Sequence, residues 1–159
     1  MEDVKYTQET IKNIGVNFED LWYSFDGDII LDNAEDDGGK PFSGIAYELY
    51  NNGNLAYFCF YKNGLKHGVY KSFYESGKIK CYQFMEYGFV SGKSECFFEN
   101  GNIKSICNSE LGIKLSYKEW DENGNLIIDE ELSPDSSNYK LLLSRREEFK
   151  KFKESIKEI

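Results

Sequence analysis

Few residues of this chain have the types and spacing that catalysis or metal binding requires. The single histidine, His67, lies in the predicted turn 63–68, and no paired cysteine or carboxylate motif stands near it. No glycine-rich loop leads into Gly-Lys-Ser/Thr, and no nucleophile elbow or metal-binding helix motif occurs. We therefore expect a protein that is not an enzyme, with no catalytic residue, cofactor or metal, and we expect His67 to be a solvated turn residue.

Cysteines are the other residues that could carry chemistry. They lack any Cys-x-x-Cys spacing and any histidine partner, and they stand at Cys59, Cys81, Cys96 and Cys107. This pattern favours reduced thiols packed in or on a sheet over a disulfide or metal framework. The chain begins Met1-Glu2-Asp3 without an apolar run, so we expect no secretory signal or membrane span and a cytoplasmic location.

Negative charge is concentrated at the start of the chain. Residues 1–37 hold eleven carboxylates against two lysines, which gives −9, the same net charge as all 159 residues together. Such acidity argues against direct binding of nucleic acid or of an anionic membrane, because both attract a basic face. It either favours a basic protein partner or only keeps the chain soluble.

The most acidic stretch is the sequence DNAEDDGGK at residues 32–40, which has almost no apolar side chain to bury. We expect a surface loop there. The loop is either a solvated connection or a docking patch for cationic side chains of a partner. In the second case its partner-binding residues are Asp32, Glu35, Asp36 and Asp37.

A repeated pattern between Gly44 and Glu131 predicts the framework that must position the candidate residues. Rows of 24 residues begin at Gly44, Gly68 and Gly92, and a fourth row starts one residue early, at Leu115. Self-similarity at a fixed period of this size indicates a repeat architecture. Each row has a glycine nine residues after its start, at Gly53, Gly77, Gly101 and Gly124.

Each row is predicted to fold as a β-hairpin. Two apolar strands flank a turn that is Asn-Gly in three of the four rows, the pair best suited to a two-residue turn with positive φ at both central residues. Successive hairpins then pair edge to edge. The predicted fold class is mainly β: one elongated antiparallel sheet of repeated hairpins, followed by a C-terminal α-helix.

Alternation in the second strand of each row separates the two faces of this sheet. Phe58, Tyr82 and Ile106 stack on one face and predict a structural ladder. The opposite face mixes polar and apolar side chains, and we expect it to meet solvent or a partner. From this part of the array we take four further partner-binding candidates: Tyr47, Tyr57, Tyr61 and Met85.

The segments that flank the array are less regular. Residues 1–19 are either a short strand or a frayed terminus. Asp26-Gly27 lies between two apolar runs, which is typical of a hairpin and indicates a terminal repeat that has drifted.

A C-terminal helix is predicted after residue 138. Leu142, Phe149 and Ile156 recur every seven residues and form an apolar stripe. The helix either lies on the sheet or its last edge, or docks into a partner. We accordingly divide the chain into an acidic segment (1–40), the hairpin array (41–131), and a loop with the helix (132–159).

The repeated pattern Gly-x-x-x-x-[Leu/Phe/Trp]-[Tyr/Phe]-x-x-Gly-x-[Leu/Ile], with its lead-in Pro41-Phe42-Ser43-Gly44, resembles the variant MORN repeat of antitoxins in the YwqK-like toxin-antitoxin family. The resemblance covers residues 41–131, with a weaker echo from Asp20. It implies an elongated hairpin sheet without catalytic residues. It also implies an antitoxin or immunity protein that binds and neutralises a cognate bacterial toxin by protein–protein interaction.

The partner expected from this resemblance is a toxin with a basic active-site cleft, since many such toxins act on nucleic acid. Carboxylates of the 32–37 loop would then mimic phosphate and speed association. MORN-type repeats also occur in scaffold and membrane-junction proteins. The alternative function is therefore a scaffold or membrane-associated interaction module, although the charge balance disfavours a membrane.

Overall fold

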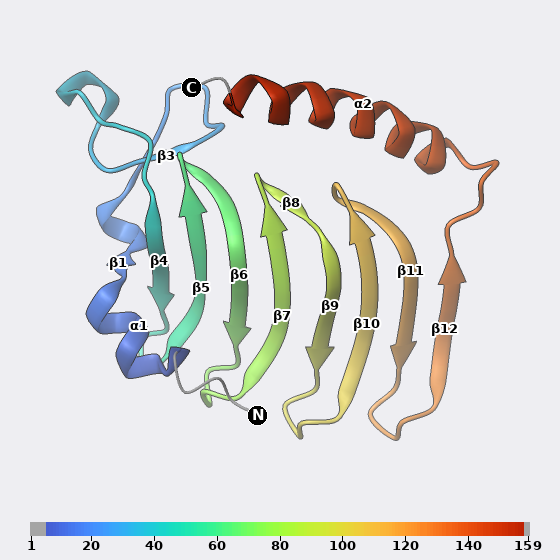
Figure 1. Cartoon of the computed structure of the whole chain (residues 1–159). Coiled ribbons are helices and arrows are strands. Elements are labelled where there is room, and N and C mark those ends of the chain that lie inside the picture. Colours follow the sequence, from blue (N-terminus) through green and yellow to red (C-terminus); the bar gives the residue numbers. More distant parts are fainter. Residues whose placement is uncertain (1–5, 158–159) are drawn as a thin grey trace.

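Strands that are adjacent in sequence pair with one another and build one elongated ten-stranded sheet (Figure 1). The computed structural model describes residues 6–157. The strands of the array are β4 (Gly44–Leu49), β5 (Leu55–Lys62), β6 (Leu65–Phe73), β7 (Ile79–Glu86), β8 (Phe89–Val90), β9 (Gly92–Phe97), β10 (Ile103–Glu110), β11 (Ile113–Trp120) and β12 (Leu126–Glu131). The predicted fold class is confirmed, and the one parallel pairing within these described residues joins β1 (Val16–Asn17) to β4.

The N-terminal segment covers the first strands of the sheet instead of adding a repeat to it. α1 (Gln8–Ile14) is capped by Thr7, whose Oγ1 accepts the Thr10 N–H (3.2 Å), and Ile11 is fully buried. A frayed terminus is therefore wrong for residues 8–14, and the predicted strand is present only as β1; residues 1–5 lie outside the described part of the chain.

The predicted hairpin around Gly27 is present but lies outside the array. β2 (Trp22–Tyr23) and β3 (Ile30–Leu31) form a separate two-stranded sheet, so the interpretation as a drifted first repeat is wrong. Short 3-10 helices flank this sheet, η2 (Phe18–Asp20) before it and η3 (Glu35–Asp37) after it.

The first strands of the array carry a core on each face. On one face α1 helps to bury a cluster of Ile11, Ile45, Leu55, Phe58 and Phe73. The opposite, mixed face carries a second cluster of Ile30, Ala46, Cys59, Tyr61 and Met85, covered by Phe18, Leu21 and Phe42. The expectation that the mixed face stays open is therefore wrong for this half of the sheet.

Two kinds of turn alternate along the array. Turns with positive φ at both central residues occur at Asn63-Gly64, Tyr87-Gly88 and Leu111-Gly112. At Asn52-Gly53, by contrast, only Gly53 has positive φ (82°), and its N–H donates to the Tyr50 carbonyl oxygen (2.9 Å). This is a three-residue turn that ends in a bulge, so the prediction of two-residue Asn-Gly turns is wrong. The Asn52 side chain instead accepts the Asn54 N–H (2.9 Å).

Side chains at the bulged turns bond to the backbone of the next repeat. The Tyr50 hydroxyl donates to the Phe73 carbonyl oxygen (2.8 Å), and the Tyr74 hydroxyl donates to that of Phe97 (2.7 Å). The next equivalent residue is Phe98, which has no hydroxyl. Further bonds of this kind join Asn52 and Asn54 to the Glu75 carbonyl, Lys78 to that of Glu99, and Asn102 to that of Glu122.

Cys81 and Cys96 form a disulfide bond, so the expectation of four reduced thiols is wrong for this pair. The two residues are direct partners in the register of β7 and β9, and their Cα atoms lie 4.1 Å apart. Direct cross-strand partners point to the same face, which brings the two sulfurs together. Cys59 and Cys107 are free.

β12 is the last strand of the sheet and pairs only with β11 (Figure 1). Its second half consists of Asp129, Glu130 and Glu131, all of them exposed. Asp129 forms an ion pair with Lys118 of β11 (3.1 Å). The predicted division of the chain at residues 40 and 131 stays a prediction.

Tyr50→Phe and Tyr74→Phe should each lower the free energy of unfolding by about 1 kcal/mol, because each leaves a backbone carbonyl without its hydrogen bond. Urea unfolding followed by circular dichroism measures the change. Tyr47→Phe is the matched control, since the Tyr47 hydroxyl makes no hydrogen bond among residues 6–157. Equal stability of all three variants would show that these bonds do not hold the repeats together.

Candidate functional site

α2 (Ser137–Lys157) lies across one end of the sheet, over the turns between β5 and β6, β7 and β8, and β10 and β11 (Figure 1). The Tyr139 N–H donates to Ser136 Oγ (3.1 Å), which caps the start of the helix. Leu142 is buried. The helix covers strand ends, and neither a face of the sheet nor the β12 edge, which corrects its predicted position.

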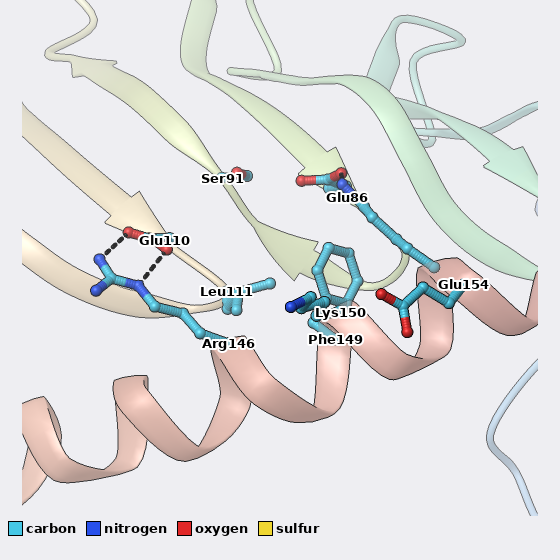
Figure 2. A pocket seen from close by; sticks show the side chains of 9 residues that line it. Glu86, Ser91, Glu110, Leu111, Arg146, Phe149, Lys150 and Glu154 are labelled. Carbon is cyan, nitrogen blue, oxygen red and sulfur yellow. Dashed lines mark hydrogen bonds and ion pairs between the residues drawn. The ribbon is translucent and has the colours of Figure 1, made fainter.

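Polar contacts fix α2 to the turns and leave a groove of about 410 Å³ beside them. Figure 2 shows Arg146 reaching from the helix to Glu110 at the end of β10, with two N–O distances of 2.7 Å. Arg145 Nη1 donates to the Leu111 carbonyl oxygen (2.8 Å). Lys153 forms an ion pair with Glu86 of β7.

Aromatic rings pack around a second, smaller cavity between α2 and the turn at residue 87. Phe149 and Phe152 stack on each other, and both meet the Tyr87 ring edge to face, at centroid distances of 6.1 and 5.2 Å. The Arg145 guanidinium lies over the Phe89 ring. The lining of the groove includes both ion pairs and the Phe149 ring, and these contacts give α2 a structural role in this fold.

His67 lies at the start of β6 and is half-buried, so its prediction as a solvated turn residue is wrong. Its ring centroid is 4.4 Å from that of Tyr87, and its Nδ1 accepts the Tyr87 N–H at 3.4 Å. Burial lowers the pKa of His67, with a smaller contribution from Lys62. Among the described residues, no group of three or more histidine, cysteine or carboxylate side chains is placed to hold a metal ion.

The four acidic candidates lie on the surface around η3. Asp36 and Asp37 point into solvent without a side-chain hydrogen bond or ion pair among the described residues. Glu35 Oε2 accepts the Phe25 N–H (2.6 Å), and Asp32 Oδ1 accepts the Lys40 N–H (2.7 Å). Two of the four carboxylates therefore also hold the backbone of the loops.

The four array candidates are not gathered at one surface. Tyr61 and Met85 are buried in the second core cluster, so they cannot contact a partner as the chain is folded here. Tyr57 is half-buried and stacks on Tyr70 (5.7 Å), and burial raises its pKa. Tyr47 is half-buried on the other face, beside the first cluster.

An exposed aromatic group at residues 22–25 was missed by the sequence analysis. Trp22, Tyr23 and Phe25 were interpreted as strand residues of a hairpin, but their side chains lie on the surface. The sequence does contain a signal for this exposure. The aromatic residues stand between Asp20, Asp26 and the acidic loop that follows, so few nearby residues are apolar and able to cover them.

Arg146→Gln should raise the pKa of Glu110 toward its ordinary value, because the hydrogen bond from Arg146 is the main cause that lowers it. A lowered pKa stabilises the fold above the ordinary carboxyl range, and the gain is lost as the pH falls through the folded-state pKa. Carboxyl NMR titration measures the shift. Lys150→Gln, in the same groove but without an ion pair among the described residues, should leave the Glu110 titration unchanged; an equal shift there would contradict this assignment.

No helix in the described part of the chain is long and apolar enough to cross a membrane.

Known proteins resemble this chain in sequence. The family model of the MORN repeat variant matches residues 66–86 and 91–110, which correspond to the hairpins β6–β7 and β9–β10. No solved structure matches the chain.

A curated relative resembles nearly the whole chain. Immunity protein YwqK of Bacillus subtilis (strain 168) is 61% identical over 143 residues, which cover 90% of this chain and 93% of the relative. The matched length exceeds that of the hairpin array at residues 41–131, so the similarity does not rest on the repeats alone. The chain therefore belongs to the YwqK-like family of MORN-repeat immunity proteins.

Proposed function

We propose that this protein is a cytoplasmic antitoxin that binds a cognate bacterial toxin and neutralises it by contact, without catalysis of its own. The observation that carries the proposal is the 61% identity to a relative named an immunity protein, over 90% of the chain. A scaffold role at an anionic membrane has less support, because the acidic N-terminal surface would be repelled by the headgroups.

The fold is suited to binding because it presents a long framework with charged loops at one end. Asp36 and Asp37 of η3, outside the repeats, are exposed, and no ion pair within residues 6–157 neutralises them. A toxin that acts on nucleic acid needs a basic cleft, and carboxylates that occupy such a cleft exclude the phosphates of the substrate.

Co-expression tests the proposal. The probe is the candidate toxin domain, sought in the open reading frames beside this gene and expressed from an inducible promoter with or without this chain. Colony counts should fall sharply with the toxin alone and return to the uninduced level with both proteins. Continued killing while both proteins are soluble would refute the antitoxin function.

Neutralising the acidic loop should slow association with that toxin. Asp36→Asn with Asp37→Asn should lower the association rate about threefold to tenfold at low salt and flatten its salt dependence, since long-range attraction acts mainly on the encounter. Adding Asp32→Asn and Glu35→Gln should enlarge the effect. Surface plasmon resonance at several ionic strengths measures the rates.

The matched control is Glu99→Gln with Glu122→Gln, which removes two exposed carboxylates at bulged turns on the far end of the sheet. Their carbonyl groups, and not their carboxylates, bond to the neighbouring repeats. Identical association rates for the loop variant and the wild-type chain would remove the loop from the binding mechanism.

A further inference from the structure

We infer that the exposed aromatic side chains Trp22, Tyr23 and Phe25 form the anchor with which this chain docks on an arginine- and lysine-rich surface of its protein partner. The inference rests on the proposed function, in which that partner is the toxin. It adds a specific binding surface that lies outside the hairpin repeats.

The exposure of these three side chains is unusual for their type. Trp22 is 52% exposed, Tyr23 is 62% and Phe25 is 77%, although they stand within four consecutive positions. Single exposed apolar residues are common on soluble proteins, but adjacent large aromatic ones mark interaction surfaces. Tryptophan and tyrosine are also the residues that most often dominate binding energy at protein interfaces.

The backbone that carries the aromatic side chains is held in place. The Ser24 N–H donates to the Ile29 carbonyl oxygen (3.0 Å), and Gly27 donates to that of Ser24 (2.8 Å). The Phe25 N–H is bound by Glu35, and the Ile30 N–H donates to the Gly64 carbonyl oxygen of the array (3.0 Å). A surface ordered in advance loses less conformational entropy when it binds, which raises affinity.

Charge identifies the chemistry of the occupant. Exposed carboxylates flank the aromatic residues in the sequence at Glu19, Asp20, Asp26 and Asp28, and Asp36 lies in η3, whose Glu35 binds the Phe25 N–H; these five carboxylates are called the acidic rim. All four ion pairs among residues 6–157 lie between residues 86 and 153, so no cation of the described chain neutralises this acidic rim. Hydrogen bonds from Ser24 and Asp28 lower the pKa of Asp26, which keeps it ionised.

Exposed aromatic side chains in an acidic segment fit a cationic protein surface. Guanidinium and ammonium groups bind both to the faces of aromatic rings and to carboxylates. A second copy of this chain is a poor occupant, because it would bring the same negative rim against the first. The Phe25 N–H is bound by Glu35 of the acidic loop, so the loop and the aromatic segment are adjacent and one partner can meet both.

NMR of a ¹⁵N-labelled chain tests the inference, with the unlabelled toxin domain from the co-expression experiment as the probe. The sequence has two tryptophans, Trp22 and Trp120, so only two indole N–H signals arise, and Trp120→Phe assigns them. On addition of toxin the Trp22 signal should shift or broaden, while the Trp120 signal should stay in place.

Substitution supplies the second measurement. Trp22→Ala combined with Phe25→Ala should raise the dissociation constant for the toxin at least tenfold, through faster dissociation. Ile127→Ala, an equally exposed apolar residue on β12, is the matched control and should bind like the wild-type chain. Both side chains of the double variant are exposed, so its thermal midpoint should stay near the wild-type value.

The outcomes separate the inference from the proposed function. Tight toxin binding with an unmoved Trp22 signal and an unchanged affinity of the double variant would overturn the aromatic anchor and keep the antitoxin function. Failure of the wild-type chain to bind or protect would overturn both. Dimerisation of the chain alone that Trp22→Ala abolishes would assign the surface to a second copy and also overturn the inference.

Discussion

A sheet one layer thick has two apolar faces and only its own flanking segments to cover them, and this constraint governs the whole structure. Residues 8–42 meet it for the first strands, with α1 on one face and the segment from Phe18 to Phe42 on the other. The later strands have no such cover. On the side that carries Cys59 and Met85 earlier in the array, the later strands carry the small polar side chains Ser94, Ser105 and Ser109, which their neighbours bury.

Contacts between neighbouring repeats hold the hairpins of the array in place, as expected for a repeat protein in which each repeat contacts only its neighbours. Hydroxyl groups of Tyr50 and Tyr74 secure the bulged turns at one end. At the other end α2 crosses the tighter turns and reaches back to β7 and β10 through Lys153 and Arg146. The helix thus contacts several repeats at once, which nearest-neighbour contacts alone do not achieve.

The array was predictable from the sequence because its information is local: glycines at a fixed spacing define turns, and alternation defines faces. The covering segments were not, because α1 is a short helix whose stability comes from burying Ile11 against the sheet. The Cys81–Cys96 bond follows from strand register and not from spacing in the sequence. At the candidate site the exposure of Asp36 and Asp37 could be predicted from their charge alone. The burial of Tyr61 and Met85 could not, because it depends on the segment from Phe18 to Phe42 that packs over them, and the local sequence pattern does not reveal that packing.

The acidic second half of β12 disfavours the addition of another strand at this edge of the sheet. A hairpin array can grow without limit, since its final strand offers the same unpaired backbone donors and acceptors that each inner strand uses to hold the next. In the second half of β12 these backbone groups belong to Asp129, Glu130 and Glu131. A second copy of the chain would bring the same net negative charge toward them. Edge-to-edge pairing of two copies through β12 is thereby opposed.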